Sequence, residues 1–376
     1  MTRLFALLAA FAFIASAHAQ APRSPNPKPV TPPFEVSVFA EGLEHPWGLA
    51  LLPDGRLLVT ERPGRLRLVS REGKLSEPLG GVPEVFARGQ GGLLDVALSP
   101  RFKEDRTIFL SFAEPGQGGA GTAVARARLE EKNLQDVNVI WRQAPKVSGT
   151  NHWGSRLVFA RDGSLFITTG DRQEHKDQAQ NPANTIGTVV RVQADGAVPK
   201  DNPFVADKAK RTEIFSYGHR NIQAAALHPK TGALWVVEHG PRGGDELHRV
   251  QAGLNYGWPV ITYGVNYDGS RITDKREAPG LEQPAYYWDP VIAPSGALFY
   301  TGKAFAGWQG DLLVGSLRPG GLVRLRLDGE RVALEERYRR GALDTRVRAL
   351  VQGPQGEIFA ATDQKNGRIL RISPRS

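Results

Sequence analysis

A short unit that recurs along the chain constrains the fold more than any other feature of the sequence. Each copy combines a turn rich in charged residues, Pro or Gly with a short apolar run that reads as a strand. The turns are marked by six residues: Gly55, Arg106, Gly163, Gly232, Gly296 and Gly356. Successive markers lie 51 to 69 residues apart, which gives each interval room for about four strands and their loops. The spacing predicts an all-β, six-bladed β-propeller with four-stranded antiparallel blades, because a single β-sandwich does not explain six copies.

Alternating segments support this prediction. Residues 64–69, 321–327 and 367–372 alternate apolar and basic side chains, as half-buried strands do, and no long stretch keeps a helical period. Residues 34–40 also alternate and are expected to form a first strand that completes the last blade and closes the ring. The propeller is therefore expected to occupy residues 34–376.

The first 33 residues have a different composition. The chain has a charged start, continues with an apolar run over 4–15 and reaches a small-residue site at Ala17-His18-Ala19. This pattern predicts a secretory signal peptide over 1–19, cut after Ala19. The apolar run is too short to span a bilayer, which disfavours the alternative of an uncleaved anchor. Residues 20–33 contain six prolines and are expected to form an extended leader. The sequence thus predicts a periplasmic or secreted protein.

Composition excludes several classes of partner and site. The chain has no cysteine, so disulfides and lipid attachment through cysteine are excluded. The formal net charge is +9, but the Lys and Arg residues are scattered and the predicted export argues against nucleic acid, so we expect no nucleic-acid partner. No stretch after the first apolar run is long and apolar enough for a membrane helix, so we expect no stable insertion into a membrane. The motifs of catalytic zinc and of nucleotide-binding loops are absent as well.

Polar residues concentrate in a few loops next to the predicted strands. In a propeller, loops at equivalent ends of the innermost strands converge at the mouth of the central channel, so residues far apart in sequence can form one site. His152 precedes one strand and Asp171 follows it, nineteen positions later, which suggests a base and a carboxylate that orients it. Several loops also place arginine beside glycine, a combination suited to a small anionic ligand. The loops that carry these residues are 89–95, 151–157, 168–171, 218–221, 238–241, 316–318 and 344–348.

Four histidines between Tyr217 and Pro259 invite a metal interpretation. They recur every nine to eleven residues, which successive strands and turns explain better than a zinc site does. They are His219, His228, His239 and His248.

The ordered set of loop motifs resembles the soluble pyrroloquinoline-quinone-dependent sugar dehydrogenases, and their aldose sugar dehydrogenase branch most closely. The resemblance covers essentially all of 34–372. It rests on His152, Gly170-Asp171, Gly218-His219-Arg220-Asn221, Glu238-His239-Gly240-Pro241, Asn255-Tyr256-Gly257-Trp258-Pro259 and the pair Arg346 and Arg348. The family is a six-bladed propeller that carries the quinone and calcium, so the resemblance implies an exported quinoprotein that oxidises aldose sugars at the anomeric carbon to lactones.

The resemblance also implies roles for single residues. His152 would be the general base, Asp171 would orient it, and Arg220 would stabilise negative charge on the quinone. The quinone would be held by Gln90, Arg220, Asn221, Arg318, Arg346 and Arg348. The carbonyls of Gly240 and Pro241 would bind the calcium that contacts the quinone. Glu246 and Tyr256 match positions of a second, structural calcium.

The chain departs from glucose-oxidising relatives at two positions. Arg318 stands where they have lysine, and Asn151 where they have aspartate, so the resemblance does not fix the preferred sugar. Trp153 is either a stacking surface for a sugar ring or a packing residue. The alternatives to a dehydrogenase are a calcium-dependent propeller lactonase or hydrolase and a non-catalytic sugar-binding propeller. The expected partners are a sugar substrate and an unidentified electron acceptor, with the protein a monomer or a homodimer.

Overall fold

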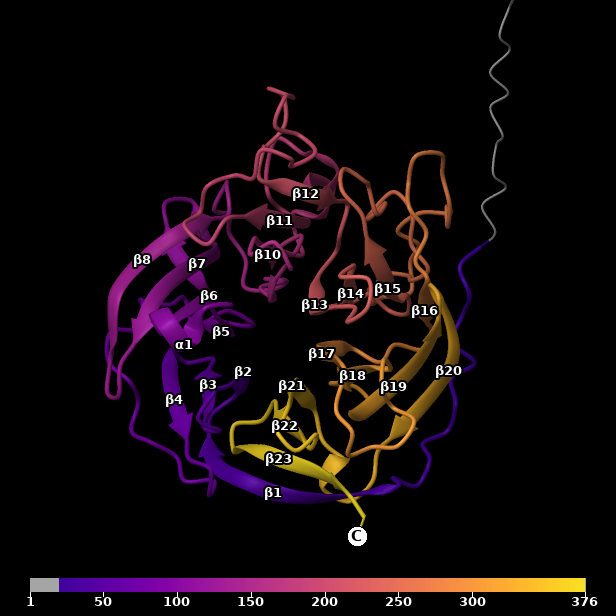
Figure 1. Cartoon of the computed structure of the whole chain (residues 1–376). Helices are drawn as coiled ribbons and strands as arrows, with labels where there is room; N and C mark the ends of the chain where they lie inside the picture. The colour runs from indigo at the N-terminus through magenta and orange to yellow at the C-terminus, as the bar shows by residue number, and fades with distance from the viewer. Residues whose placement is uncertain (1–19, 376) are drawn as a thin grey trace, which may run out of the picture.

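The protein is a ring of six antiparallel β-sheets around a central channel (Figure 1). The computed structural model describes residues 20–375, and the predicted signal peptide lies outside that range. The described part contains 23 strands and only short helices: α1 (Phe102–Asp105), η1 (Lys176–Gln180) and η2 (Gly341–Leu343). No helix in this part is long and apolar enough to cross a membrane. The prediction of a six-bladed β-propeller is confirmed.

In each blade of the first half, the first strand lies nearest the channel and the later strands follow outward (Figure 1). The first blade contains β2 (Pro46–Leu51), β3 (Leu57–Glu61) and β4 (Arg65–Val69). The second contains β5 (Leu93–Leu98), β6 (Thr107–Gly116), β7 (Gly119–Leu129) and β8 (Leu134–Arg142). The third contains β9 (Leu157–Phe159), β10 (Leu165–Thr168), β11 (Thr188–Val192) and β12 (Ile214–Tyr217).

The second half of the ring repeats this arrangement. The fourth blade contains β13 (Ile222–Leu227), β14 (Leu234–Glu238), β15 (Asp245–Val250) and β16 (Tyr286–Trp288). The fifth contains β17 (Pro294–Phe299), β18 (Leu312–Ser316), β19 (Gly321–Asp328) and β20 (Arg331–Tyr338). The sixth contains β21 (Val347–Gln352), β22 (Ile358–Thr362), β23 (Gly367–Pro374) and, on its outer edge, β1 (Phe34–Leu43).

The first blade has three regular strands rather than four. Residues 75–79 take the place of the fourth: Ser76 N donates to Leu68 O and Leu79 N to Leu66 O, each over 2.8 Å. Pro78 has no N–H to give to the ladder, which explains why this edge does not form a continuous strand.

The last blade closes the ring as predicted. Strand β1 pairs antiparallel with β23, from Phe34 opposite Pro374 to Leu43 opposite Gly367. The closing blade therefore joins the two ends of the propeller, as the adjacent indigo and yellow ribbons in Figure 1 show.

Five of the six sequence markers lie in the turn between the first and second strands of a blade, but Gly296 does not. It lies within β17, and a Cβ at this position would come within 2.7 Å of Ala349 Cα on the neighbouring inner strand. Gly296 is therefore a packing glycine where two inner strands approach closely. The turn that starts the second strand of this blade ends at Gly310, so the marker in the fifth copy was assigned wrongly.

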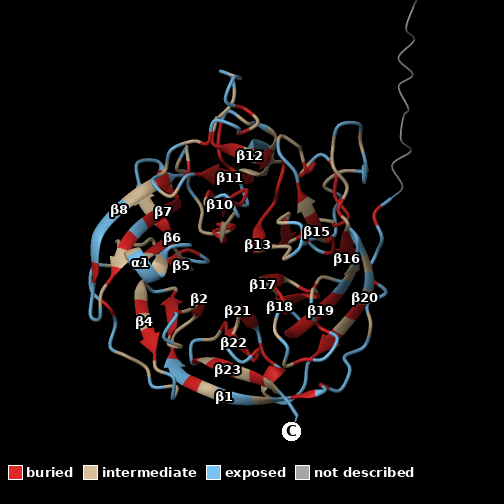
Figure 2. Ribbon diagram, in the orientation of Figure 1, coloured by how far each residue is buried: buried red, intermediate tan, exposed pale blue. Residues whose placement is uncertain are grey.

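The core of the molecule lies between neighbouring blades. One cluster, for example, joins Trp235 and Val237 of β14 with Leu312 and Val314 of β18. Figure 2 shows buried residues in the inner strands and exposed residues on the outer ones. Burying each large apolar side chain contributes roughly 1.5–3 kcal/mol, so the blades hold one another in place.

The proline-rich segment 20–33 contributes no strand to a sheet and lies along the outer edge of the fourth and fifth blades. Ser24 N donates to Tyr287 O over 2.8 Å, and Val30 N donates to Arg337 O over 2.9 Å. The Ser24 hydroxyl also binds the buried carboxylate of Glu335 at 2.5 Å. The leader, which the sequence predicts to lie outside the propeller domain, is attached to the propeller by specific polar contacts.

Candidate functional site

A polar cavity of about 230 Å³ opens at one end of the channel. Two kinds of loop supply its functional side chains: loops that lead into the first strand of a blade, and loops that follow the second strand. Among the predicted residues, those that line it are Gln90, His152, Arg220, Asn221, Arg318, Arg346 and Arg348. The structure therefore brings the predicted base and all the predicted quinone-binding residues together.

Asp171 lies directly behind His152. His152 Nδ1 and Asp171 Oδ1 are 2.6 Å apart, and Asp171 is fully buried. His152 lines the cavity, so its second ring nitrogen, Nε2, is the one that remains for a ligand. The pair has the geometry of a base and the carboxylate that orients it.

The two pKa values of this pair favour a neutral imidazole beside a charged carboxylate. Burial lowers the pKa of His152 below its ordinary value of 6.5, and the nearby Arg220 lowers it further, against the opposing effect of Asp171. Burial alone would raise the pKa of Asp171, but the hydrogen bond and charge of His152, the charge of Arg220 and the hydrogen bond from Gln173 N together lower it. A neutral imidazole at neutral pH can accept a proton.

The loop that carries His152 is held in an unusual conformation. His152 has a φ of 53°, which lies in the left-handed region that side chains other than Gly rarely adopt. The side-chain oxygen of Gln90 accepts from His152 N over 2.9 Å, and that of Asn221 accepts from Gly154 N over 3.1 Å. Both amides thus fix the loop through their oxygens, and their NH₂ groups remain as donors toward a ligand.

Trp153 is among the residues that line the cavity, but it is packed too tightly to offer an open surface for a sugar ring. Its side chain is 1% exposed, and the guanidinium of Arg172 lies 3.4 Å from the ring centroid. Arg172 also donates to the carbonyls of Gly149, Asn151 and Ala120 over 2.8 to 3.0 Å. The tryptophan and this arginine therefore support the His152 loop from behind.

Buried arginine nitrogens without a partner mark the cavity as an anion site. Arg220 donates through Nη1 to His239 O over 2.9 Å, and Arg348 donates through Nη1 to Gln223 Oε1 over the same distance. Within residues 20–375, neither Arg220 Nε nor Arg348 Nε has a hydrogen-bond partner, although both atoms are buried. An anionic ligand in the cavity would supply the missing acceptors.

Two charged residues of the cavity were missed at the sequence level, Arg62 and Asp363. Arg62 follows β3 directly and Asp363 follows β22 directly, the same place in the blade from which His239 follows β14. A position directly after the second strand of a blade is therefore the sequence signal that identifies Arg62 and Asp363. Asp363 is the one carboxylate among the described residues that line the cavity, against five arginines.

Gly240 and Pro241 lie outside this cavity and line an adjoining one of about 550 Å³, which shares His239 and Arg318 with it. Their loop is held by the buried carboxylate of Asp245, which accepts from Gly240 N over 2.9 Å. Within the described range, neither carbonyl oxygen accepts a hydrogen bond from the protein. Free carbonyl oxygens next to a carboxylate are the ligands that calcium prefers, so these residues fit the ion.

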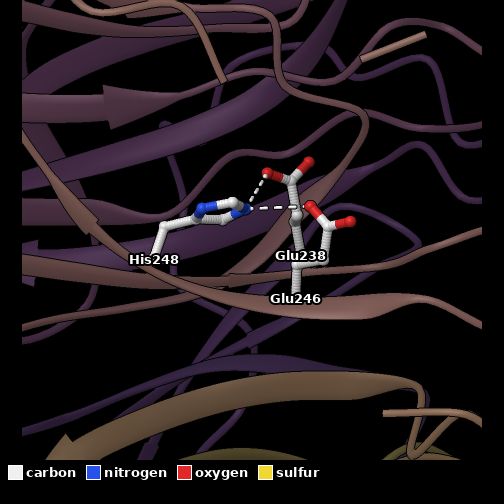
Figure 3. Close-up of side chains that lie close together, drawn as sticks. All are labelled: Glu238, Glu246 and His248. Atoms are coloured by element: carbon white, nitrogen blue, oxygen red, sulfur yellow. Dashed lines mark hydrogen bonds and ion pairs between the residues drawn. The ribbon is translucent and has the colours of Figure 1, made fainter. Parts of the chain in front are cut away.

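Glu246 forms a separate cluster with Glu238 and His248 (Figure 3). The Tyr256 ring packs against this cluster, with its centroid 4.9 Å from that of His248. His248 Nε2 lies 3.0 Å from Glu246 Oε2 and 3.3 Å from Glu238 Oε1. Burial opposes a charged His248, but its bonds to the two carboxylates outweigh this and raise its pKa to about 9. The Tyr256 hydroxyl faces elsewhere, toward Arg249 O at 2.9 Å.

The predicted second calcium therefore stays a prediction. The ligand atoms of Glu238, Glu246 and His248 lie within 4.8 Å of one another, close enough for a metal ion. Without an ion, the same atoms already form a cluster in which His248 Nε2 contacts both carboxylates. Glu238 also accepts from His219 Nδ1 at 3.0 Å and from Arg220 N at 2.5 Å, which connects the cluster to the cavity.

Comparisons with known proteins identify the family of the chain. A family model described as glucose/sorbosone dehydrogenase matches residues 43–371. An aldose sugar dehydrogenase of Escherichia coli is 43% identical over 349 residues, which cover 91% of this chain and 93% of the relative. A solved glucose dehydrogenase structure is 47% identical, with a TM-score of 0.88, over 91% of this chain and all of the other.

A more distant structure carries the quinone. The quinone-bound aldose sugar dehydrogenase from Streptomyces coelicolor is 27% identical, with a TM-score of 0.75, over 92% of this chain and 99% of the other. The family match spans most of the chain and agrees with the propeller fold. The chain belongs to the glucose/sorbosone dehydrogenase family.

Proposed function

We propose that the protein is an exported quinoprotein that oxidises aldose sugars at the anomeric carbon to lactones, with pyrroloquinoline quinone and calcium as cofactors. The observation that carries the proposal is that Arg220 and Arg348, which line the cavity together with His152, each keep a buried Nε without a hydrogen-bond partner in residues 20–375. A ligand with several carboxylates would supply acceptors for these arginines beside a neutral base.

The residues of the cavity divide into those that bind and those that move a proton. The quinone would be held by the NH₂ groups of Gln90 and Asn221 and by the guanidinium groups of Arg220, Arg318, Arg346 and Arg348. The carbonyls of Gly240 and Pro241 would bind the calcium. When bound, the quinone supplies the two-electron acceptor for the hydride of the anomeric carbon.

His152 would take the proton of the anomeric hydroxyl at Nε2, because its Nδ1 is already bound to Asp171. Asp171 would stabilise the imidazolium that results and keep the ring in one orientation. Arg220, which lies beside the base in the cavity, would stabilise negative charge that develops on the acceptor during the transfer.

The alternatives explain the cavity less well. A propeller hydrolase that uses calcium in the channel needs several carboxylate ligands, whereas the one carboxylate lining the described cavity, Asp363, is bound to two arginines. A binding-only propeller has no use for a buried base held by a carboxylate. Export, the electron acceptor and a monomeric or homodimeric state are parts of the proposal that rest on the sequence.

Reconstitution tests the function directly. Purified protein should gain dye-linked oxidation of aldoses only when both the quinone and calcium are added, with the sugar lactone as product. His152→Ala should bind both cofactors and lose turnover by roughly 10²–10⁴-fold, the usual contribution of a positioned base. Near-normal turnover of cofactor-loaded His152→Ala would remove the base from the mechanism. Absence of any aldose oxidation in the loaded wild type would refute the function.

A further inference from the structure

The side chain of Trp258 makes a direct contact with the carboxylate behind the base. Its indole Nε1 donates to Asp171 Oδ2 over 2.8 Å, while Asp171 Oδ1 faces His152 Nδ1 at 2.6 Å. The three side chains therefore form a continuous chain of hydrogen bonds, although Trp258 itself is not among the residues that line the cavity. Asp171 is 0% exposed, so water does not replace a donor that is lost there.

The same tryptophan also contacts the arginine of the site. The guanidinium carbon of Arg220 lies 5.3 Å from the centroid of the Trp258 ring, within the range of a cation–π interaction. Trp258 thus contacts both the partner of the base and the cationic group beside it.

The backbone around Trp258 is fixed on both sides. Trp258 N donates to Gly218 O over 2.9 Å, and Gln180 Nε2 donates to Trp258 O over 2.7 Å. Gln180 is in turn bound to Asn255 through both atoms of its amide, at 2.8 and 3.0 Å. The indole is therefore held in place before any ligand binds, as a residue that orients others must be.

We infer that Trp258 is a positioning residue for the proposed sugar oxidation: its N–H fixes Asp171 so that the carboxylate orients His152, and its ring fixes Arg220. This inference rests on the proposed function, because it assigns Trp258 to the base that the oxidation needs. The N–H and the ring act on different groups, so substitutions can separate the two contributions.

Removal of the N–H has a defined electrostatic effect. In Trp258→Phe the aromatic face over Arg220 is kept, but the buried carboxylate of Asp171 loses one donor. A carboxylate with fewer donors is a stronger proton acceptor, so the His152–Asp171 pair should bind a proton at higher pH. The other charged or titratable groups that act on the pair, Arg172, Arg220 and His239, are unchanged in this variant.

The chain offers a matched control in Trp141 on β8. This tryptophan is also buried, at 7% exposure, but its Nε1 has no hydrogen-bond partner within the described residues. Trp141→Phe therefore removes the same atoms from a buried indole without removing a hydrogen bond. A general effect of the smaller ring would appear in both variants.

The first experiment compares kcat and kcat/KM across pH for wild type, Trp258→Phe and Trp141→Phe, each loaded with quinone and calcium. For Trp258→Phe we expect kcat to fall about tenfold or more, because a hydrogen bond to a charged group is worth about 1.5–3 kcal/mol. We also expect the acid limb of its profile to move to higher pH, with unchanged quinone affinity. Trp141→Phe should match the wild type.

The second measurement needs no cofactor. The indole N–H resonance of Trp258, identified by its loss in Trp258→Phe, should move in a ¹H–¹⁵N spectrum when Asp171 is replaced by Asn, and that of Trp141 should not. An unchanged pH profile of Trp258→Phe would overturn the positioning role. So would a Trp258 indole resonance that has the same position in Asp171→Asn as in the wild type. In both cases aldose oxidation by the wild type would leave the proposed function intact. A loaded wild type that oxidises no aldose would instead refute the function, and with it the role of Trp258.

Discussion

Arg348 Nη2 lies 2.7 Å from Asp363 Oδ2, and Arg346 binds the same oxygen at 2.8 Å, so one carboxylate holds both arginines that the sixth blade contributes to the cavity. Burial would raise the pKa of Asp363, but the two arginines outweigh it and keep the carboxyl ionised. The arginines are thus placed at the cavity before an anionic ligand arrives.

Asp363→Ala should destabilise the protein, because Arg348 would remain buried without its partner charge. Breaking one side of a buried ion pair typically costs about 3–5 kcal/mol. Denaturant unfolding of the cofactor-free protein measures the loss. Addition of the quinone should restore more stability to this variant than to the wild type, since its carboxylates can replace that of Asp363. Equal stabilisation of both proteins would contradict this account.

Arg318→Ala should weaken quinone binding without changing stability, in contrast to Asp363→Ala. Arg318 is exposed at the cavity and its side chain has no hydrogen-bonded partner among residues 20–375, so loss of the side chain should leave the unfolding free energy unchanged. Quinone affinity should fall by roughly tenfold or more, because one charge-assisted contact of about 1.5–3 kcal/mol is removed. Arg348→Ala should weaken quinone binding similarly but also lower stability. Titration of the quinone into each variant, paired with its unfolding curve, separates the two cases.

The pH dependence of kcat/KM should follow the low pKa of His152. A lowered pKa means that the imidazole is neutral, and able to accept a proton, at pH 6.5 and somewhat below. The midpoint of the acid limb should therefore lie below pH 6.5. Asp171→Asn removes the carboxylate that opposes this effect and should move the acid limb lower still, with slower turnover. An acid limb above pH 7 in the wild type would show that His152 is not the titrating base.

Asp245→Asn should loosen the proposed calcium loop. The Asp245 carboxylate accepts from Gly240 N, Ile292 N and Ala293 N, all within 2.9 Å, and it is 1% exposed. An amide oxygen replaces only one of its two acceptors, so a buried N–H loses its partner at a cost of about 1–3 kcal/mol. Calcium affinity, measured by calorimetry on the quinone-loaded protein, should fall. Glu282→Gln, in a partly exposed loop, is the control and should bind calcium normally.

The sequence predicts the parts of the fold that repeat. Regular turns and short alternating strands indicate six blades, and the alternation at 34–40 identifies the closing strand. The pattern does not separate a turn glycine from a packing glycine, which is why Gly296 was misplaced. The sequence pattern also does not show that Pro78 interrupts the outer edge of the first blade. It does not show either that residues 20–33 bind the outer edges of the fourth and fifth blades.

The site was predictable where a residue type and a loop position coincide, as for His152, Asp171 and the arginines. Asp363, Arg62 and Asp245 were missed because their importance comes from neighbours distant in sequence. Asp245, for instance, accepts from residues 47 and 48 positions away. Trp153 and Trp258 show the same limit. Both follow a polar motif in the sequence, and only the folded chain distinguishes the tryptophan that supports a loop from the one that binds a carboxylate.

The pairing of β1 with β23 has a consequence for the order in which the molecule is completed. Phe34 lies opposite Pro374 in this pair. Strand β1 therefore has no strand to pair with until β23, near the C-terminal end of the sequence, has been made. Segment 20–33 likewise lacks its binding partners until the fourth and fifth blades have been made, because its contacts lie on those blades. A partly synthesised or partly transported chain therefore cannot reach the locked ring. Loss of the last ten residues would leave both β1 and β22 with unpaired edges, which other chains could then extend.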